Sequence, residues 1–162
     1  MHSMKYLLLS LLSCLLPNGI RAQFVDVSSD VVFETNFFSG RLGQGVSVTD
    51  INGDYEDDVT FAHAEGLIRC YVGNGLGGFE ELALDLEGAA GEDAKMVLWA
   101  DVDNDGDQDL FVTFRLARNR MYLNDGNMNL SLVNVGLHED EQKSYGATFG
   151  DVNGDGFLDL FV

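Results

Sequence analysis

Short apolar runs alternate with polar, glycine-rich stretches along most of this chain, and the alternation repeats about every fifty residues. Several runs end in Asn-Gly or Asp-Gly, dipeptides that favour the tight turns of β-hairpins. After the N-terminal segment, no window shows the spacing of apolar residues that is typical of an amphipathic helix. The pattern therefore predicts an all-β protein built from short antiparallel strands.

Two complete units can be aligned, and each is expected to hold four strands. In the first unit the strands are expected at 45–49, 57–62, 67–72 and 79–84. In the second unit they are expected at 95–100, 108–114, 119–123 and 129–133. Four strands in about 40–50 residues is the size of one β-propeller blade. The units are placed at about 40–90, 91–140 and 141–162, and the third is expected to be truncated after its second strand.

Each unit carries one acidic loop between its first two expected strands. The loops begin at Asp50, Asp101 and Asp151, and side chains that contain oxygen occupy loop positions 1, 3, 5 and 9. Calcium is a hard cation that takes about six to eight oxygen ligands, so this arrangement suits it. Turn formation alone also favours Asp, Asn and Gly, but it does not require Asp at position 9 in every copy. The loops therefore predict calcium sites rather than plain turns.

An EF-hand calcium loop begins with similar spacing, but it also needs an acidic ligand at position 12 and two flanking helices. Position 12 is occupied here by Phe61, Val112 and Val162, within runs that are typical of strands. The sequence therefore excludes an EF-hand or a dockerin.

The similarity between units extends beyond the loops. An apolar residue precedes the first Asp by two positions, a small residue precedes it directly, and an apolar strand follows position 9. This Asp-x-Asx-x-Asp-Gly-x-x-Asp-Leu-Phe-Val pattern, with a Tyr-x-Asn-Asp-Gly strand end after it, resembles the FG-GAP/VCBS repeats, the blades of integrin-α-like propellers. Phe149 and Gly150 resemble the Phe-Gly element of that name. The resemblance covers about 24–162 and implies a calcium-binding β-propeller.

The resemblance also implies which residues hold calcium. Side chains at positions 1, 3, 5 and 9 would be ligands, and position 7 would offer its backbone carbonyl. The implied ligands are Asp50, Asn52, Asp54, Glu56 and Asp58; Asp101, Asp103, Asp105, Asp107 and Asp109; and Asp151, Asn153, Asp155, Phe157 and Asp159.

The first loop departs from the family pattern at position 6, where Tyr55 replaces the glycine found in the other two loops. Glycine adopts a positive φ without steric cost, whereas a bulky side chain resists it. The first site is therefore expected to bind calcium most weakly, or to be slightly rearranged.

The N-terminal segment, residues 1–22, has the layout of a secretory signal peptide. Lys5 precedes an apolar run that ends at Leu16, and cleavage is expected after Ala22. The run is shorter than the roughly 20 apolar residues that a membrane-spanning helix needs. The mature repeat region, 23–162, is thus expected to be secreted and not inserted in a membrane. Cys14 offers an alternative, attachment through a lipid anchor.

The chain is strongly acidic, with 27 acidic and 9 basic residues and a formal net charge of −18. This balance argues against nucleic acid or anionic membranes as partners, because both need clustered Lys and Arg. Arg115, Arg118 and Arg120 form the only local basic cluster, which is interpreted as a solvated edge or as a contact for an acidic partner.

Few other residues suggest chemistry. Cys70 would be the only cysteine after signal removal, so no internal disulfide can form, and its alignment with Met121 favours a buried packing role over a reactive thiol.

Trp99 is interpreted as blade packing. The aligned Tyr71 and Tyr122 are interpreted as structural, His63 and His138 lack a partner at zinc-ligand spacing, and Asn129 fits the pattern of a glycosylation acceptor.

No catalytic constellation is visible outside the acidic loops. The sequence therefore favours a non-enzymatic, secreted, calcium-binding propeller protein that acts as an adhesion or ligand-binding scaffold for an extracellular protein or carbohydrate. The alternative is the repeat portion of a secreted polysaccharide-degrading or phosphodiesterase-type enzyme whose catalytic residues lie elsewhere. Residues 24–34 resemble outer strands that complete a blade, so the chain is expected to be an N-terminal fragment of a longer propeller.

Overall fold

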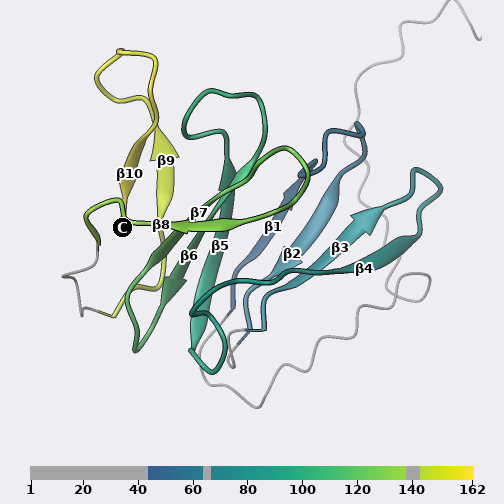
Figure 1. The fold of residues 1–162 in the computed structure, drawn as a ribbon, viewed down its shortest axis with the longest axis horizontal. Coiled ribbons are helices and arrows are strands. Elements are labelled where there is room, and N and C mark those ends of the chain that lie inside the picture. The colour runs from purple at the N-terminus through teal and green to yellow at the C-terminus, as the bar shows by residue number, and fades with distance from the viewer. Residues whose placement is uncertain (1–43, 64–66, 138–142) are drawn as a thin grey trace, which may run out of the picture. The chain divides into compact units, whose positions relative to one another are not determined.

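The computed structural model describes residues 44–63, 67–137 and 143–162, and the regular elements found there are ten β-strands (Figure 1). The predicted all-β class is confirmed for this part of the chain. Several predictions lie outside the described residues: the signal peptide at 1–22 with Cys14, the outer strands at 24–34, and His138. In the described segments, no helix has the length and apolar character needed to cross a bilayer.

The strands form two four-stranded antiparallel sheets and one two-stranded sheet, and in each sheet strands that follow one another in the chain are neighbours. The first sheet contains β1 (Val46–Thr49), β2 (Asp58–Phe61), β3 (Arg69–Gly73) and β4 (Phe79–Ala83). The second contains β5 (Ala94–Ala100), β6 (Asp109–Phe114), β7 (Arg120–Leu123) and β8 (Ser131–Val133). The third pairs β9 (Thr148–Gly150) with β10 (Asp159–Phe161).

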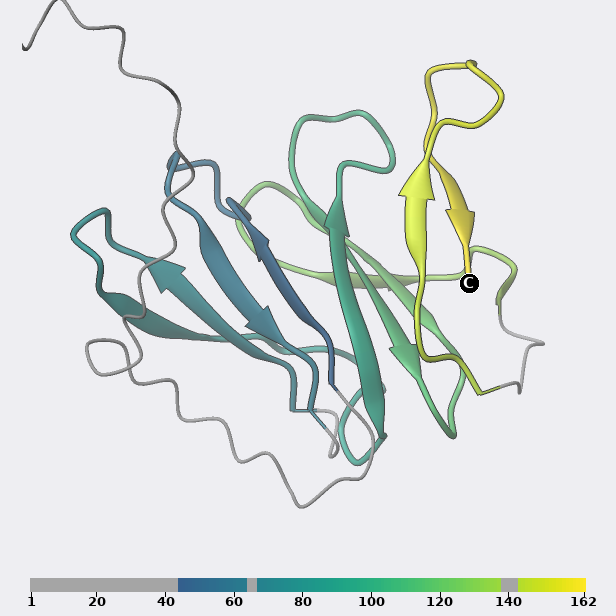
Figure 2. The ribbon, with the colours of Figure 1, turned by 180° about the vertical axis from the view of Figure 1, so that it is seen from behind.

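Each four-stranded sheet has the strand order of a propeller blade. The eight strands predicted for the two complete units are all present and differ from the prediction only at their ends. The sheets do not close into a ring within the described residues (Figures 1 and 2). We refer below to the first, second and third sheets as blades 1, 2 and 3.

The core is centred on β6, whose six residues are all buried. A strand that is covered on both faces needs apolar side chains on both, and the run Leu110-Phe-Val112 supplies them. Leu110, Val112 and Phe114 belong to the main buried cluster, which also includes Trp99 and Tyr122. Blade 2 therefore holds the best-buried part of the described chain.

Equivalent residues of successive units meet where the blades pack together. Trp99 of β5 donates a buried hydrogen bond from its indole Nε1 to Thr60 Oγ1 of β2, at 3.0 Å. Phe149 of β9 packs edge-on against Phe111 of β6, with ring centroids 6.1 Å apart. Trp99 and Phe149 occupy one repeat position, and Thr60 and Phe111 occupy another. The predicted packing role of Trp99 is thus confirmed, and the contact recurs from blade to blade.

The aligned residue of the first unit, Val48, does not share this environment. Its side chain is 57% exposed, and Val46 beside it is 56% exposed. Within the described residues, no preceding blade covers this face of β1. A repeat unit buries such a face only against its neighbour, so the alignment alone could not predict the burial of Val48.

Successive units also approach closely through their backbones. The Gly45 amide donates to the Lys95 carbonyl at 2.7 Å, and a Cβ atom on Gly45 would lie only 2.9 Å from Met96 Cα. Gly45, Met96 and Gly146 occupy the same position of the three units, five residues before the first Asp. The Met96 sulfur in turn accepts a hydrogen bond from the Ala147 amide, at 3.2 Å. One methionine side chain therefore lies between two glycine positions.

The cysteine and the two aligned tyrosines have the structural roles that the sequence predicted. Cys70 is fully buried, Met121 at the same repeat position is 4% exposed, and burial raises the pKa of the Cys70 thiol to about 11. A thiol with such a pKa stays protonated at neutral pH and is a poor nucleophile. Tyr71 and Tyr122 are buried, and the Tyr122 hydroxyl donates to the Glu87 carbonyl at 2.9 Å.

The hydrogen bond between blades 1 and 2 leads to a testable prediction. Thr60→Val should lower the free energy of unfolding by about 1–3 kcal/mol, because the Trp99 N–H would stay buried without an acceptor. The measurement is equilibrium urea unfolding of the full chain.

Thr113 on β6 provides the matched control. It is fully buried, but its hydroxyl has no hydrogen-bond partner among the described residues. Thr113→Val removes an unsatisfied polar atom, so this variant should be as stable as the parent or up to about 1 kcal/mol more stable. A similar loss of stability in both variants would contradict the role assigned to the bond between Thr60 and Trp99.

Candidate metal sites in the acidic loops

The three acidic loops connect the first two strands of each blade, and the strand register brings the two ends of each loop together. The residue before the first Asp pairs with the last Asp in every blade, as Thr49 with Asp58, Ala100 with Asp109 and Gly150 with Asp159. Loop position 9 is therefore the first residue of the returning strand. This pairing explains the constant spacing of eight residues between the first and last Asp.

The carboxylate at position 1 organises the interior of each loop. Asp50 accepts hydrogen bonds from the amides of Gly53 and Asp54 through Oδ1, at 2.8 and 3.1 Å, and from the Tyr55 amide through Oδ2, at 2.8 Å. Asp151 accepts the three corresponding amides of its loop, and Asp101 accepts two of them, from Asp105 and Gly106. The hydrogen bonds from these amides, that of Gly156 first, lower the pKa of Asp151. The third loop thus wraps around an ionised carboxylate.

The carboxylate at position 9 fixes the loop to the sheet. Asp109 accepts the Val102 amide through Oδ2, at 3.0 Å, and the Asn124 amide through Oδ1, at 2.9 Å. Asp58 makes the same two bonds, to the amides of Ile51 and Gly73, both at 2.9 Å. Both carboxylates are 1% exposed, and burial raises the pKa of each above the ordinary value.

The sequence predicted position 9 only as a metal ligand and did not reveal this second role. Gly73 is the last residue of β3 and Asn124 comes directly after β7, and the two occupy the same repeat position. A carboxylate oxygen has two lone pairs, so accepting one amide leaves room for a cation. The hydrogen bonds of position 9 are therefore compatible with metal ligation.

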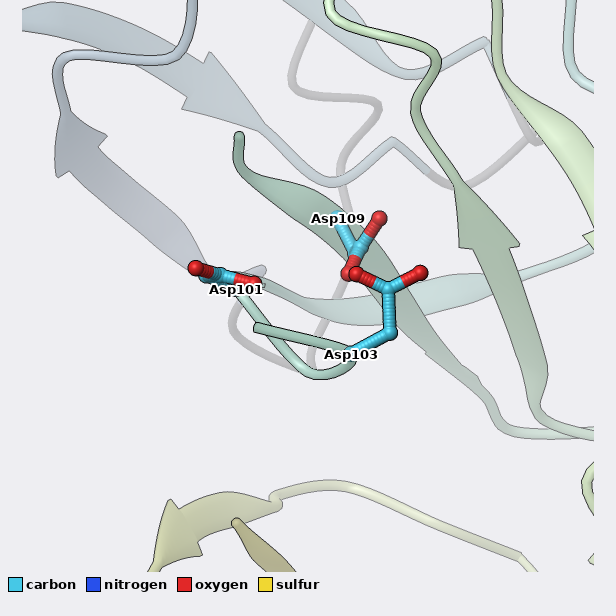
Figure 3. A group of neighbouring side chains, drawn as sticks. All are labelled: Asp101, Asp103 and Asp109. Atoms are coloured by element: carbon cyan, nitrogen blue, oxygen red, sulfur yellow. The ribbon is translucent and has the colours of Figure 1, made fainter. Parts of the chain in front are cut away.

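The second loop brings three carboxylates to one point. Ligand atoms of Asp101, Asp103 and Asp109 all lie within 4.8 Å of one another, with Asp109 on β6 and the other two in the loop (Figure 3). Asp105 and Asp107 follow in the same loop, and burial together with neighbouring carboxylates raises the pKa of Asp107 to about 6. The second loop thus concentrates negative charge that no cationic side chain of the described residues pairs with.

The first and third loops each have one carboxylate fewer among positions 1, 3, 5 and 9, because position 3 is an asparagine. Asn52 donates from Nδ2 to Asp54 Oδ2, and Asn153 does the same to Asp155, both at 3.0 Å. Each of these side-chain amides donates one hydrogen bond to the carboxylate at position 5. The aspartate at position 3 of the second loop has no donor and cannot do so. The three loops therefore share a shape but differ in electrostatics.

The donor set fits a hard divalent cation. Every predicted side-chain ligand lies in one of the three loops, and all of the donors are oxygens, which calcium prefers. At position 7 the amides of Glu56, Asp107 and Phe157 donate to the carboxylate at position 5. Within the described residues their carbonyl oxygens accept no hydrogen bond, so they remain free to coordinate a cation.

The turn at position 6 is the same in all three loops. Tyr55 adopts a φ of 71°, close to the 100° of Gly106 and the 88° of Gly156. The side chain of Tyr55 is 95% exposed, so nothing in the described residues compensates for the strain. The first loop therefore keeps the shape of the others instead of being rearranged. Its weaker affinity for calcium stays a prediction.

Neighbouring loops also lie side by side. The first two loops line one pocket of about 340 Å³ that includes Asp50, Asn52 and Asp107. The side chain of Asn104 in the second loop reaches the Gly156 carbonyl in the third, at 3.4 Å. The loops of all three blades thus gather at one end of the strands (Figure 1).

Comparison with known families identifies the same repeat unit. Residues 50–112 and residues 101–162 each match the family model of the FG-GAP-like repeat. Both matched segments begin at position 1 of one acidic loop and end three residues beyond position 9 of the next, so consecutive loops define them. No curated protein matches the chain.

The role of position 9 in fixing the loop to the sheet can be separated from metal ligation. In the presence of a chelator, Asp109→Ala should lower the free energy of unfolding by about 2–4 kcal/mol, because two backbone amides lose their acceptor. Asp103→Ala should cost nothing under the same conditions, because the Asp103 side chain is exposed and its removal relieves repulsion. Urea unfolding of both variants measures the difference, and equal losses would contradict the structural role of Asp109.

The strain at Tyr55 also gives a prediction. Tyr55→Gly should raise the free energy of unfolding by about 0.5–1 kcal/mol, because glycine adopts a positive φ without a clash. Tyr55→Ala removes the same side chain but keeps Cβ, so this control should show no gain. Thermal unfolding of the parent and both variants tests the expectation, and an equal gain in both would show that the aromatic ring, and not φ, is responsible.

Proposed function

Because this chain belongs to the family of FG-GAP-like repeat proteins, we propose that it is a secreted protein that binds Ca²⁺ in its acidic loops and serves as an adhesion or ligand-binding scaffold. FG-GAP-like repeats form propeller-type domains that are commonly extracellular and typically non-catalytic, which supports a scaffold over an enzyme. The observation that carries the calcium proposal is the convergence of Asp101, Asp103 and Asp109 within 4.8 Å.

A bound calcium ion would supply positive charge at the point where the loop carboxylates converge. Asp101 is already oriented by loop amides, and Asp109 is already fixed to the sheet, so neither has to be ordered when the ion binds. Within the described segments no hydrogen bond holds the Asp103 side chain, so the cation would draw it in. A ligand that binds only the folded state adds its binding free energy to stability.

We further propose that the three sites differ in affinity. The second loop offers aspartate at positions 1, 3, 5, 7 and 9 and should bind most tightly, because affinity for calcium rises with ligand charge. The third loop offers one carboxylate fewer at position 3 and none at position 7. The first loop has the same asparagine and also the strained turn at Tyr55, so its site should be weakest.

Export from the cytoplasm is supported by the signal-peptide layout of residues 1–22. The extracellular fluid supplies calcium at about millimolar concentration, which extracellular calcium modules match with dissociation constants of about 10⁻⁴–10⁻³ M. The proposed sites therefore suit the proposed location. A rigid, calcium-stabilised blade array presents fixed loops and edges to a partner, which is what a scaffold requires.

Calorimetry of the full chain tests the calcium proposal. The melting temperature should be higher in calcium than in chelator, by an amount that corresponds to about 2.7 kcal/mol when free calcium exceeds Kd a hundredfold. Magnesium should stabilise less, because it demands near-ideal octahedral geometry and retains its water.

The matched variants are Asp103→Asn and Asp85→Asn. Both remove one exposed negative charge, but Asp85 lies outside the acidic loops. Asp103→Asn should reduce the shift produced by calcium, and Asp85→Asn should not. An unchanged melting temperature in calcium and chelator would contradict calcium binding, and equal effects of the two variants would show that calcium acts only through overall charge.

A further inference from the structure

A basic pocket lies at the end of blade 2 that is opposite its acidic loop. It has a volume of about 510 Å³, and four of its seven lining residues are the cations Arg115, Arg118, Arg120 and Lys143. In the described segments Lys and Arg occur at only two other positions, Arg69 and Lys95. In a chain with a net charge of −18, most of the described positive charge therefore gathers around one hollow.

Buried hydrogen bonds hold the walls of this pocket in place. The turn between β6 and β7 is closed by Asn119, whose Oδ1 accepts the Phe114 amide at 3.0 Å. Asn119 Nδ2 donates to Ser144 Oγ at 2.8 Å, and this bond fixes the segment that carries Lys143. Both Asn119 and Ser144 are buried. The pocket is therefore built by the fold and does not depend on the conformations of exposed side chains alone.

The arginines are positioned but not neutralised. Arg115 donates from Nε to Asp93, and Lys95 shares the same carboxylate at 2.6 Å, so two cations divide one negative charge. The guanidinium of Arg120 lies over the Phe114 ring, 4.5 Å from its centroid, and its Nη1 is buried with no hydrogen-bond acceptor among the described residues. Arg118 and Lys143 pair with no carboxylate in the described part of the chain.

The acidic loops do not cancel this charge. The six residues of β6 separate the second acidic loop from the turn that carries Arg115, which corresponds to roughly 20 Å. This distance is about two and a half times the Debye length at physiological ionic strength, which is about 8 Å, so the loop charges are largely screened at the pocket. Among the residues that the structure describes, Glu92 is the one carboxylate that lines the pocket, against four cationic side chains. The described lining therefore carries a net positive charge.

A second pocket adjoins the basic one. It has a volume of about 340 Å³ and shares Arg118 and Arg120 with the basic pocket. The rest of its lining is mainly apolar and includes Leu132, Val133 and Val135, of which Leu132 and Val135 are 38% and 49% exposed. Arginine guanidinium groups beside an apolar pocket suit a ligand that has an anionic group at one end and an apolar group at the other.

We propose that these two pockets form a binding site for a small organic anion, with its carboxylate or sulfonate-type group on Arg118, Arg120 and Lys143 and its apolar part against Leu132 and Val135. A long polyanion is disfavoured, because the rest of the surface is strongly acidic. The inference rests on the proposed ligand-binding role and specifies the chemical class of the ligand. It does not depend on calcium in the acidic loops.

The test is a set of titrations into the full chain, followed by ¹H–¹⁵N NMR in constant calcium. Three probes are used. Phenylacetate carries both the anionic and the apolar group, acetate carries only the anionic group, and 2-phenylethanol carries the apolar group without a charge. Phenylacetate should bind at a single site about tenfold more tightly than acetate, a difference of about 1.4 kcal/mol. The NMR signal shifts produced by 2-phenylethanol should not reach saturation. Equal affinity for phenylacetate and acetate, or for phenylacetate and phenylethanol, would overturn the proposal.

Phenylmethanesulfonate distinguishes the two kinds of anionic group. Tighter binding of phenylacetate assigns the site to carboxylates, and tighter binding of the sulfonate assigns it to sulfate-like groups. If neither compound binds, the proposal is wrong. Because calorimetry in chelator tests calcium separately, failure of the anion site and failure of the calcium proposal are distinguishable.

The charge variants are Arg118→Gln and Arg69→Gln. Each removes one arginine charge, but Arg69 lies on β3 and pairs with Glu81 at 2.5 Å, away from both pockets. Arg118→Gln should weaken phenylacetate binding at least fivefold, and Arg69→Gln should leave it unchanged. Lys143→Gln, at another exposed position, provides a second pocket variant. Equal weakening by Arg118→Gln and Arg69→Gln would show unspecific charge attraction and would overturn the site.

Discussion

Each complete blade depends on one buried carboxylate at the end of its acidic loop. Asp58 and Asp109 are almost inaccessible to water, and each joins the amide at loop position 2 to an amide at the end of the third strand. Burying a charge is costly unless hydrogen bonds compensate it, and two backbone amides do so here. The candidate metal site and the sheet therefore share one anchor in each complete blade.

The second constraint acts between blades. A blade buries one face only when the next unit covers it, as Trp99 covers Thr60 and Phe149 covers Phe111. The hydrogen bond between Trp99 and Thr60 and the ring contact between Phe149 and Phe111 use the same two repeat positions. These positions therefore accept different side chains as long as the two surfaces are complementary. Blade 2, with a described neighbour on each side, accordingly contains the fully buried β6.

Much of the fold could be predicted from the sequence, because apolar alternation and turn residues directly determine strands and hairpins. The register of the acidic loops also predicted that Asp101, Asp103 and Asp109 lie close together in the second loop. The amides of Gly73 and Asn124 could not be predicted as partners of Asp58 and Asp109, because backbone groups leave no signature in side-chain identity. The turn at Tyr55 was not predicted either, because the loop imposes its conformation against the preference of that residue.

The site at the other end of blade 2 shows the same limit. The arginines at 115, 118 and 120 are visible as a cluster in the sequence, but only the fold adds Lys143 and the carboxylate of Asp93. Local sequence thus identifies the charges, and tertiary structure decides which of them remain unpaired.

The glycines on either side of Met96 have a consequence for how such a chain can be recombined. At one position the three units read glycine, methionine, glycine, and the backbones there approach too closely for two side chains. A second copy of the middle unit placed next to itself would set methionine against methionine across this contact. Although the units look interchangeable in their acidic loops, this contact prevents the middle unit from following itself along the chain.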